Sequence, residues 1–320
     1  MNNLALALLA GISAAAALPA LADESEDVGL PRGWAQLTSD PHGYVYSNDR
    51  QGDELRAAIH AKLPNAAGAS PNVDYHGGPI LISTRVDAIF WGKSWPGYKG
   101  DKFSGIDTYY EGFGGSNYAK TVTEYTGTNG AVSATVAYGT HYIDGSASIS
   151  GDNGKAILAE VCKVIAGEHI NPPTHSKRVG YYPVYTDYKR GNAGYCAWHA
   201  SGTCGGTEVT FSYFFDPDGD DGCSNHDTSG LHSPGLSDLG NSSAHELSEA
   251  RTDPYHGDGW YNNTSGKEVG DLCAHTFDVP LVTFTNGSQW KVQGEWSNRA
   301  YNSGTGYPNK DGQKGCLSGE

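Results

Sequence analysis

The sequence predicts one layered domain of the α/β or α+β class. Strand-like runs alternate with helix-like runs along most of the 320 residues, as in a sheet that is covered by helices. No internal repeat interrupts this alternation. The length suffices for one large domain or two small ones. We expect a single domain with a mixed sheet over residues 74–320.

Runs rich in β-branched and aromatic residues predict the strands. They cover residues 79–91, 131–142, 179–185 and 209–215. A Tyr-Cys-Ala-Trp-His stretch at 195–199 lies between the last two. Near the C-terminus, residues 282–284 and 290–292 alternate around Asn286-Gly287, which indicates a hairpin.

Helix-like spacing predicts four helices. They cover residues 53–62, 105–118, 155–166 and 242–252. The spacing is clearest in 155–166, where isoleucine, leucine and valine recur on one helix face. For 242–252 we expect a serine cap at the start, and Asp253-Pro254 to end the helix.

Residues 1–22 have the features of a secretory signal peptide. They carry no charged side chain, contain an apolar core and end in an Ala-Leu-Ala cleavage site. No later segment is long and apolar enough to span a bilayer. We therefore expect a secreted, extracellular protein without membrane insertion, or a periplasmic one in a Gram-negative host.

The segment 23–73 is polar and is predicted to be irregular apart from its short helix. Residues 64–71 are rich in Ala, Gly, Ser and Pro and read as a linker. The whole segment is a candidate pro-segment, and regular structure is expected to begin near Gly78.

The acidic composition argues against nucleic acid or an anionic membrane as a partner, because the formal net charge is -15 and the pI is about 5.1. The chain has 6 cysteines. An even number in an exported chain predicts a full set of disulfides, with 15 alternative pairings. Cys196 with Cys204, and Cys273 with Cys316, look easiest to close.

The predicted helix at 242–252 carries His245-Glu246-x-x-Glu249. Positions i and i+4 share a helix face, so His245 and Glu249 are expected to point the same way. This is the spacing of the H-E-x-x-H helix, in which two ligands hold Zn²⁺ and the glutamate is the general base. Here Glu246 takes the place of the base, and Glu249 replaces the second histidine. The added negative charge also brings a harder cation, such as Ca²⁺ or Mn²⁺, into consideration.

Three acidic residues are candidates for the third ligand. Glu268 lies 19 residues after Glu249, and this spacing resembles thermolysin-like gluzincins, in which a downstream glutamate completes the site. Asp271 would then orient His245. Asp253 is the alternative, because a continued helix would place it on the same face as His245. We favour Glu268, since a proline follows Asp253.

Three blocks of the chain resemble the EXORDIUM, or phosphate-induced protein, family. They are Tyr75-His-Gly-Gly-Pro-Ile-Leu81 with Asp87-Ala-Ile-Phe-Trp-Gly-Lys93, then Tyr195-Cys-Ala-Trp-His199, and finally His245 through Thr252-Asp-Pro254, Gly259-Trp-Tyr261 and Gly270-Asp-Leu-Cys273. In matching order they cover residues 74–316. The resemblance implies an extracellular or cell-wall protein with no settled biochemical activity. Catalysis is supported only by this chain's own helix, which implies a zincin-like layout with backing helices.

Other side chains have both a functional and a structural interpretation. His199 is a candidate catalytic or substrate-binding histidine because it lies in one of these blocks, although a histidine near a disulfide is often simply packed. His76 and His256 are weaker candidates. The acidic segment 216–222 could hold Ca²⁺, but a solvated turn explains it as well. No Gly-x-Ser-x-Gly elbow is present, and no spacing favours a glycosidase carboxylate pair.

Two functional hypotheses follow. The first is a secreted metal-dependent hydrolase, a zinc metallopeptidase, that acts on an extracellular protein, peptide or polysaccharide. The second is a non-catalytic extracellular module that binds carbohydrate or a wall component and has a structural or vestigial metal site. The sequence leaves the oligomeric state open.

Overall fold

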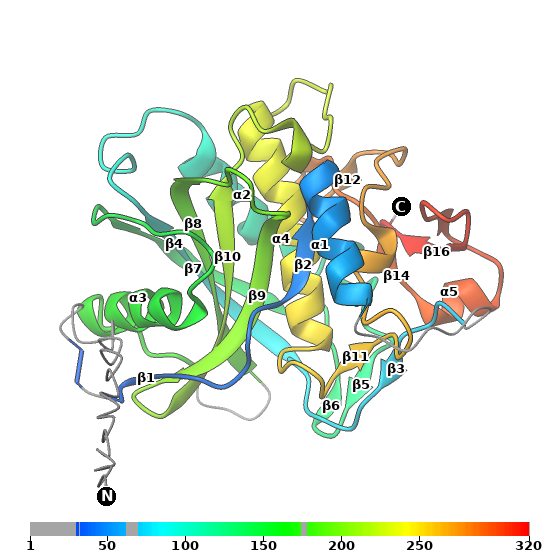
Figure 1. Cartoon of the computed structure of the whole chain (residues 1–320), viewed down its shortest axis with the longest axis horizontal. Helices are drawn as coiled ribbons and strands as arrows, with labels where there is room; N and C mark the ends of the chain where they lie inside the picture. The colour runs from blue at the N-terminus through cyan, green and yellow to red at the C-terminus, as the bar shows by residue number, and fades with distance from the viewer. Residues whose placement is uncertain (1–29, 32, 62–69, 174–177, 320) are drawn as a thin grey trace, which may run out of the picture.

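A mixed seven-stranded sheet forms the centre of the computed structural model, which describes residues 30–31, 33–61, 70–173 and 178–319 (Figure 1). In sheet order the strands are β1 (Ala35–Leu37), β9 (Tyr195–Cys204), β10 (Thr207–Asp216), β8 (Arg178–Lys189), β4 (Ser83–Trp91) and β7 (Val136–Asp144). A further strand, β2 (His42–Tyr46), also pairs with β9. The strands β10, β8, β4 and β7 are parallel, whereas β9 is antiparallel to β10 and to both N-terminal strands.

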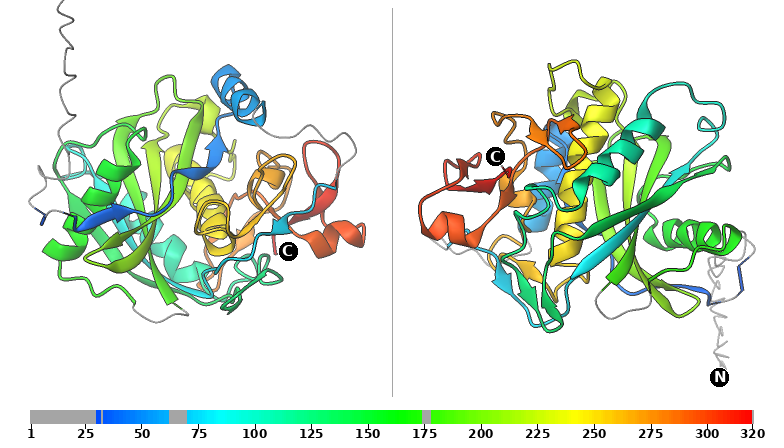
Figure 2. Two further views of the ribbon diagram at one scale, coloured as in Figure 1. Left: turned by 60° about the horizontal axis from the view of Figure 1, so that its bottom comes forward. Right: turned by 180° about the vertical axis from the view of Figure 1, so that it is seen from behind.

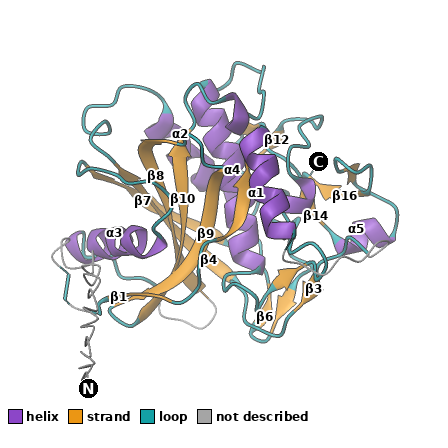
Figure 3. Cartoon of the chain, viewed as in Figure 1, coloured by secondary structure: helices purple, strands orange, loops and turns teal. Residues whose placement is uncertain are grey.

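Helices cover both faces of this sheet (Figures 1 and 3). On one face lies α3 (Gly154–Gly167), and on the other lie α2 (Lys102–Phe113) and α4 (Pro234–Thr252). The short α1 (Arg50–His60) follows β2 and packs against it. Because helices lie on both faces, the inner strands are buried on both sides.

The side chains of β4 show how the two cores are divided. Ala88 and Phe90 point into the core beneath α2 and α4, and Ile89 points into the core beneath α3. This alternation is the period of two that a strand imposes. All three residues are fully buried.

The C-terminal part of the chain packs beside α4, away from the main sheet (Figure 2). It contains β11 (Trp260–Tyr261), η3 (Asp271–Cys273), the hairpin of β12 (Val282–Thr283) and β13 (Gln289–Trp290), the helix α5 (Asn298–Asn302), and a small sheet of β14 (Glu295–Trp296), β16 (Lys314–Leu317) and β15 (Tyr307–Pro308). Earlier in the chain, β3 (Asp74–Tyr75) pairs with β11, β5 (Thr126–Gly127) pairs with β6 (Gly130–Ala131), and the 3-10 helix η2 (Asp221–Cys223) contacts β9. A third apolar cluster, which includes Val269 and Trp296, holds this part together. The loop that leads into η3 is thereby fixed against α4.

The predicted fold class is confirmed, and most predicted elements are present. The predicted hairpin forms between β12 and β13, with Gly287 at φ +83° in its turn. The main error in the helices concerns α4, which begins at Pro234 and not at residue 242. The hydroxyl of Ser233 accepts a hydrogen bond from the Leu236 amide, and a proline follows the cap, so the helix starts there. It ends at Thr252, as predicted.

The prediction that regular structure begins near Gly78 is wrong. Two strands and a helix form between Ala35 and His60, because β1 and β2 pair with the edge of β9. The predicted signal peptide, and the linker at 64–71 up to residue 69, lie outside the described residues. No helix of the described residues is long and apolar enough to cross a membrane.

Three disulfides connect the cysteines, and one of the two expected pairs is confirmed. Cys273 bonds to Cys316, as predicted. The expected Cys196–Cys204 pair is wrong, because β9 holds these residues at opposite ends of an extended strand. The bonds are instead Cys162–Cys204 and Cys196–Cys223. Three such bonds fit an oxidising, extracellular environment.

Truncation of Leu247 tests how α4 is held against the sheet. This side chain is 0% exposed in the core that α4 shares with α2. Leu247→Ala should lower the free energy of unfolding by about 2–5 kcal/mol in a denaturant titration, because it removes buried surface and leaves a cavity. The control is Leu231→Ala, whose leucine is 52% exposed, and it should cost under about 0.5 kcal/mol. Equal small losses would contradict this packing.

Candidate metal centre

The helix α4 places three ionisable side chains in the interior. His245, Glu246 and Glu249 are each 0% exposed. His245 and Glu249 lie one turn apart on one face, and His245 Nε2 is 3.1 Å from Glu249 Oε1. The neighbouring apolar residues Ala244 and Leu247 anchor the helix in the core. The helix-face prediction for this motif is therefore confirmed.

The loop before η3 closes over Glu249 from the C-terminal side. Its backbone amides at Gly270 and Asp271 donate to Glu249 Oε1 at 3.1 and 2.9 Å. The Asp271 Oδ1 atom lies 3.9 Å from His245 Nε2. A Cβ at residue 270 would lie 2.8 Å from the His245 ring, so this loop can approach only with a glycine there.

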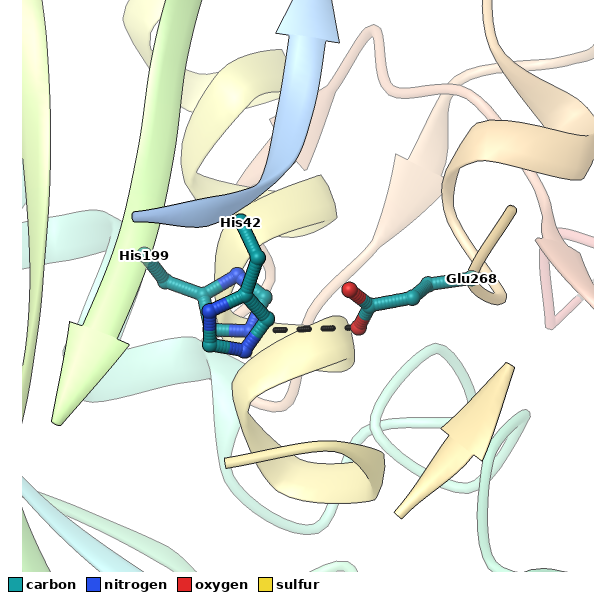
Figure 4. A group of neighbouring side chains, drawn as sticks. All are labelled: His42, His199 and Glu268. Carbon is teal, nitrogen blue, oxygen red and sulfur yellow. Dashed lines mark ion pairs between the residues drawn. The ribbon is translucent and has the colours of Figure 1, made fainter. Parts of the chain in front are cut away.

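The strand β9 contributes His199, which connects the helix to Glu268. Its Nδ1 is 3.1 Å from Glu246 Oε2, and its Nε2 is 3.8 Å from Glu268 Oε2. Figure 4 shows the Glu268 carboxylate directed towards the rings of His199 and His42. Five residues from three segments of the chain thus meet at α4, namely His199, His245, Glu246, Glu249 and Glu268.

The strand β2 supplies His42, which the sequence analysis missed. The centroid of its ring lies 4.1 Å from that of His199, and it is 3% exposed. The next residue, Gly43, has φ +57° and lies so close that a Cβ would overlap with both His199 and Glu249. The backbone of β2 therefore lies directly over His199 and Glu249. No local motif around His42 predicts this contact.

These side chains form three overlapping groups in which one ligand atom from each residue lies within 4.8 Å of the others. The groups are His42 with His199 and Glu268, then His199 with Glu246 and Glu249, and finally His245 with Glu249 and Asp271. His199 and Glu249 each belong to two groups, so all seven residues form one continuous cluster. Nitrogen and oxygen donors of this kind suit Zn²⁺ or Mn²⁺.

Several buried polar atoms of this cluster have no hydrogen-bond partner among the described residues. They are His245 Nδ1 and Nε2, Glu246 Oε1, Glu249 Oε2, Glu268 Oε2 and Asp271 Oδ1. Leaving one such group unpaired usually costs about 1–3 kcal/mol. A cation bound in one of the three groups would satisfy the unpartnered oxygen atoms of that group.

Burial and mutual charge shift the pKa values in this cluster. Burial raises the pKa of Glu246 well above its usual value, although His245 opposes the shift. Burial and the neighbouring Glu249 raise the pKa of Glu268 well above its usual value and that of Asp271 to about 7. Burial lowers the pKa of His245, but Glu249 and the other carboxylates outweigh it, so the net shift is well upward.

The pKa of His199 is shifted in the opposite direction to that of His245. Burial, and then the neighbouring His42, lower the pKa of His199 well below its usual value. Its Nε2 lies 3.1 Å from the carbonyl oxygen of Asp253. A neutral ring that donates from Nε2 can accept at Nδ1 from a protonated Glu246, so this pair is satisfied without a net charge. Without a metal, protons bound to groups of the cluster therefore neutralise the negative charge that a cation would otherwise neutralise.

The structure places the predicted site residues as follows. Asp271, which was a candidate ligand expected to orient His245, lies in the group of His245 and Glu249, whereas the favoured Glu268 lies in the group of His42 and His199. The carboxylate of Asp253 accepts a hydrogen bond from the Gly259 amide and belongs to none of the three groups.

The remaining candidates lie outside the cluster. His256 is beside His42, with 5.0 Å between the ring centroids. His76 stacks on Tyr261. In the acidic segment 216–222, Asp216 pairs with Lys102 and Lys189, and Asp220 pairs with Arg190. These ion pairs explain the acidic turn without Ca²⁺.

Comparison with known proteins adds no assignment. No protein-family model matches the chain, and neither curated proteins nor solved structures give a significant match. The chemistry of the site is therefore argued from its own geometry.

Substitution of Gly43 tests the close approach of β2. Gly43→Ala adds a Cβ that overlaps with His199 and Glu249, in addition to the cost of a left-handed backbone. The matched control is Gly191→Ala, because Gly191 has φ +60° and nothing within 4 Å of the new Cβ. In denaturant titrations Gly191→Ala should lose about 1–2 kcal/mol, and Gly43→Ala should lose clearly more. Equal losses would mean that β2 does not press on the cluster.

The raised pKa of the Asp271 carboxyl predicts that the free energy of unfolding of the chelator-treated protein depends on pH. Its folded pKa of about 7 lies above the unfolded value of about 3.9. The stability that it contributes is therefore fully present below about pH 4 and is lost as the pH rises to about 7.

Asp271→Asn should remove this contribution, so that the wild-type curve falls more steeply than that of the variant, by up to about 1.4 kcal/mol per pH unit. Urea titrations at several pH values in the presence of chelator measure the difference. Parallel curves for the two proteins would show that the Asp271 carboxyl has no raised pKa in the folded state.

Proposed function

We propose that this chain is a secreted metal-dependent hydrolase, a peptidase, whose divalent cation is held by His245, Glu249 and Asp271. The observation that carries the proposal is the concentration of unpartnered buried nitrogen and oxygen atoms around these residues. The imidazole ligand favours Zn²⁺ over Ca²⁺, which takes six to eight oxygen ligands. The three disulfides agree with the secreted location.

The residues around the cation have separate roles in this proposal. When bound, the cation supplies Lewis-acid chemistry to a scissile carbonyl. Glu246 would take the proton from the attacking water through Oε1, which has no hydrogen-bond partner among the described residues, once the charge of a bound cation keeps this carboxyl ionised. His199 holds the other oxygen of Glu246 at 3.1 Å and fixes its orientation. Glu249 is held in place by the amides of Gly270 and Asp271.

A second candidate function is a non-catalytic extracellular module with a structural metal ion. The burial of the cluster favours it, since His42, His199, Glu246 and Glu249 are at most 3% exposed. Structural zinc sites are closed, whereas catalytic sites keep one open position. The two candidates share the metal and differ in the role of Glu246.

Metal content tests the site that both functions need. Purified wild-type protein should contain about one zinc per chain by elemental mass spectrometry, and Glu249→Gln should weaken binding at least tenfold. The matched control is Glu295→Gln, because Glu295 is equally buried but belongs to none of the three groups. Absence of bound metal in supplemented wild-type protein would overturn the proposal.

Glu246→Gln separates the hydrolase from the structural site. In the hydrolase, this variant should keep its zinc and its thermal stability but lose at least about 100-fold in the cleavage rate of a denatured protein substrate. In a structural site, wild type and variant should be alike in every assay, without cleavage in either case.

A further inference from the structure

A pocket of about 180 Å³ adjoins the metal centre on the side of the C-terminal part of the chain. Asp271, a proposed ligand, forms part of its wall, and so does Tyr46 at the end of β2. Three cations, Arg56, Lys267 and Lys310, outnumber the two carboxylates in its wall, Asp271 and Asp311, so we call it the cationic pocket. The pocket reaches the otherwise buried cluster at Asp271.

The gathering of cations in this pocket is unusual for such an acidic chain, which has 21 Lys and Arg residues against 36 Asp and Glu residues. The three cations come from α1, from the loop before η3 and from the loop before β16. Only Arg56 has a carboxylate partner, Asp53 at 2.9 Å. In the described part of the chain, Lys267 makes no ion pair, and Lys310 donates only to the neutral Asn48 at 3.0 Å.

Neighbouring cations contribute, after burial, to the pKa shifts around these lysines. Burial, and then the neighbouring Arg56, lower the pKa of Lys310. Burial, Lys310 and Arg56 together lower the pKa of His275 to about 3. The ring of His275 lies in the wall with its buried Nε2 unpartnered, and its backbone is in the left-handed region at φ +59°. Strained backbone and unpaired polar atoms of this kind cluster at ligand sites.

The size of the pocket limits what it can hold. A water molecule occupies about 30 Å³, so 180 Å³ corresponds to roughly six waters. Pockets for whole small-molecule ligands usually measure about 300–1,000 Å³. One charged side chain or one small oxyanion fits, and a complete substrate does not. The remainder of a substrate would have to lie outside, towards Asp271.

We propose that the cationic pocket binds the carboxylate of an acidic residue in a substrate peptide, through Lys267 and Lys310. That the bound group belongs to a substrate rests on the proposed hydrolase function, whereas oxyanion binding by the pocket does not. Ammonium groups pair with carboxylate and with phosphate alike, so inorganic phosphate is the other source of the same chemistry. The pocket lets an acidic peptide approach a chain whose overall charge repels it.

The test compares N-acetyl-glutamate and N-acetyl-glutamine, each with its α-carboxyl group amidated so that only the first carries a carboxylate, by calorimetric or NMR titration of the full chain at low ionic strength. Wild type should bind the glutamate at least tenfold more tightly than the glutamine. Lys267→Gln and Lys310→Gln should each weaken glutamate binding about threefold. The control is Lys99→Gln, which removes the same charge from an exposed loop outside the pocket and should leave binding unchanged.

Two outcomes would overturn the assignment. Equal affinity for the two probes, or an equal effect of Lys99→Gln, would show that the pocket does not recognise a carboxylate. Inorganic phosphate that binds at least tenfold more tightly than N-acetyl-glutamate, with the same dependence on Lys267 and Lys310, would make this a phosphate site. Neither result depends on turnover, so metal content and the Glu246→Gln comparison remain separate tests of the hydrolase.

Discussion

The cluster of ionisable side chains around α4 depends on one constraint, the burial of the Glu249 carboxylate. A carboxylate removed from water is very costly unless hydrogen bonds or opposite charges replace its hydration. One of its oxygens receives the amides of Gly270 and Asp271, and the other is left without a hydrogen bond. The loop before η3 supplies those amides and β2 closes over the carboxylate at Gly43, and the open oxygen is where a bound cation would complete the compensation.

This constraint explains why segments that are distant in sequence are held so tightly. The loop before η3 can approach only with glycine at 270, and β2 can approach only with glycine at 43. In both cases the backbone itself touches the cluster. Side-chain ion pairs fix the end of β2. Arg190 pairs with Asp49 and Asp220 and so ties the N-terminal segment to the end of β10. The cluster is thus closed by main chain, and not by mobile side chains.

Local rules predicted the helical part of the site, because they depend only on spacing. The placement of His245 and Glu249 on one face follows from the period of the helix, and the proline after Asp253 correctly predicted where that face ends. The same rules brought Glu268 and Asp271 into consideration by their distance along the chain. They could not decide which of the two lies beside His245, because that depends on how the loop before η3 folds back.

The parts that were missed depend on contacts between distant residues. His42 reaches the cluster only because β2 pairs with β9, 157 residues further along the chain at His199. The predicted pairing of Cys196 with Cys204 was wrong for a related reason, since residues close in sequence were assumed to be close in space. A strand rises about 3.3 Å per residue, so β9 separates Cys196 from Cys204 by more than a disulfide can span. Patterning predicted the elements of the sheet, but strand order is set by packing that no single segment encodes.

The cover formed by β2 has a consequence for the way the protein would acquire and release its cation. An ion cannot pass a backbone that rests on two of the residues around it, so on the side of His199 and Glu249 exchange would require β2 to separate from β9. Such an exchange would proceed at the rate of a local opening of the sheet edge. The pocket beside Asp271 is the side from which a cation would exchange with β2 in place.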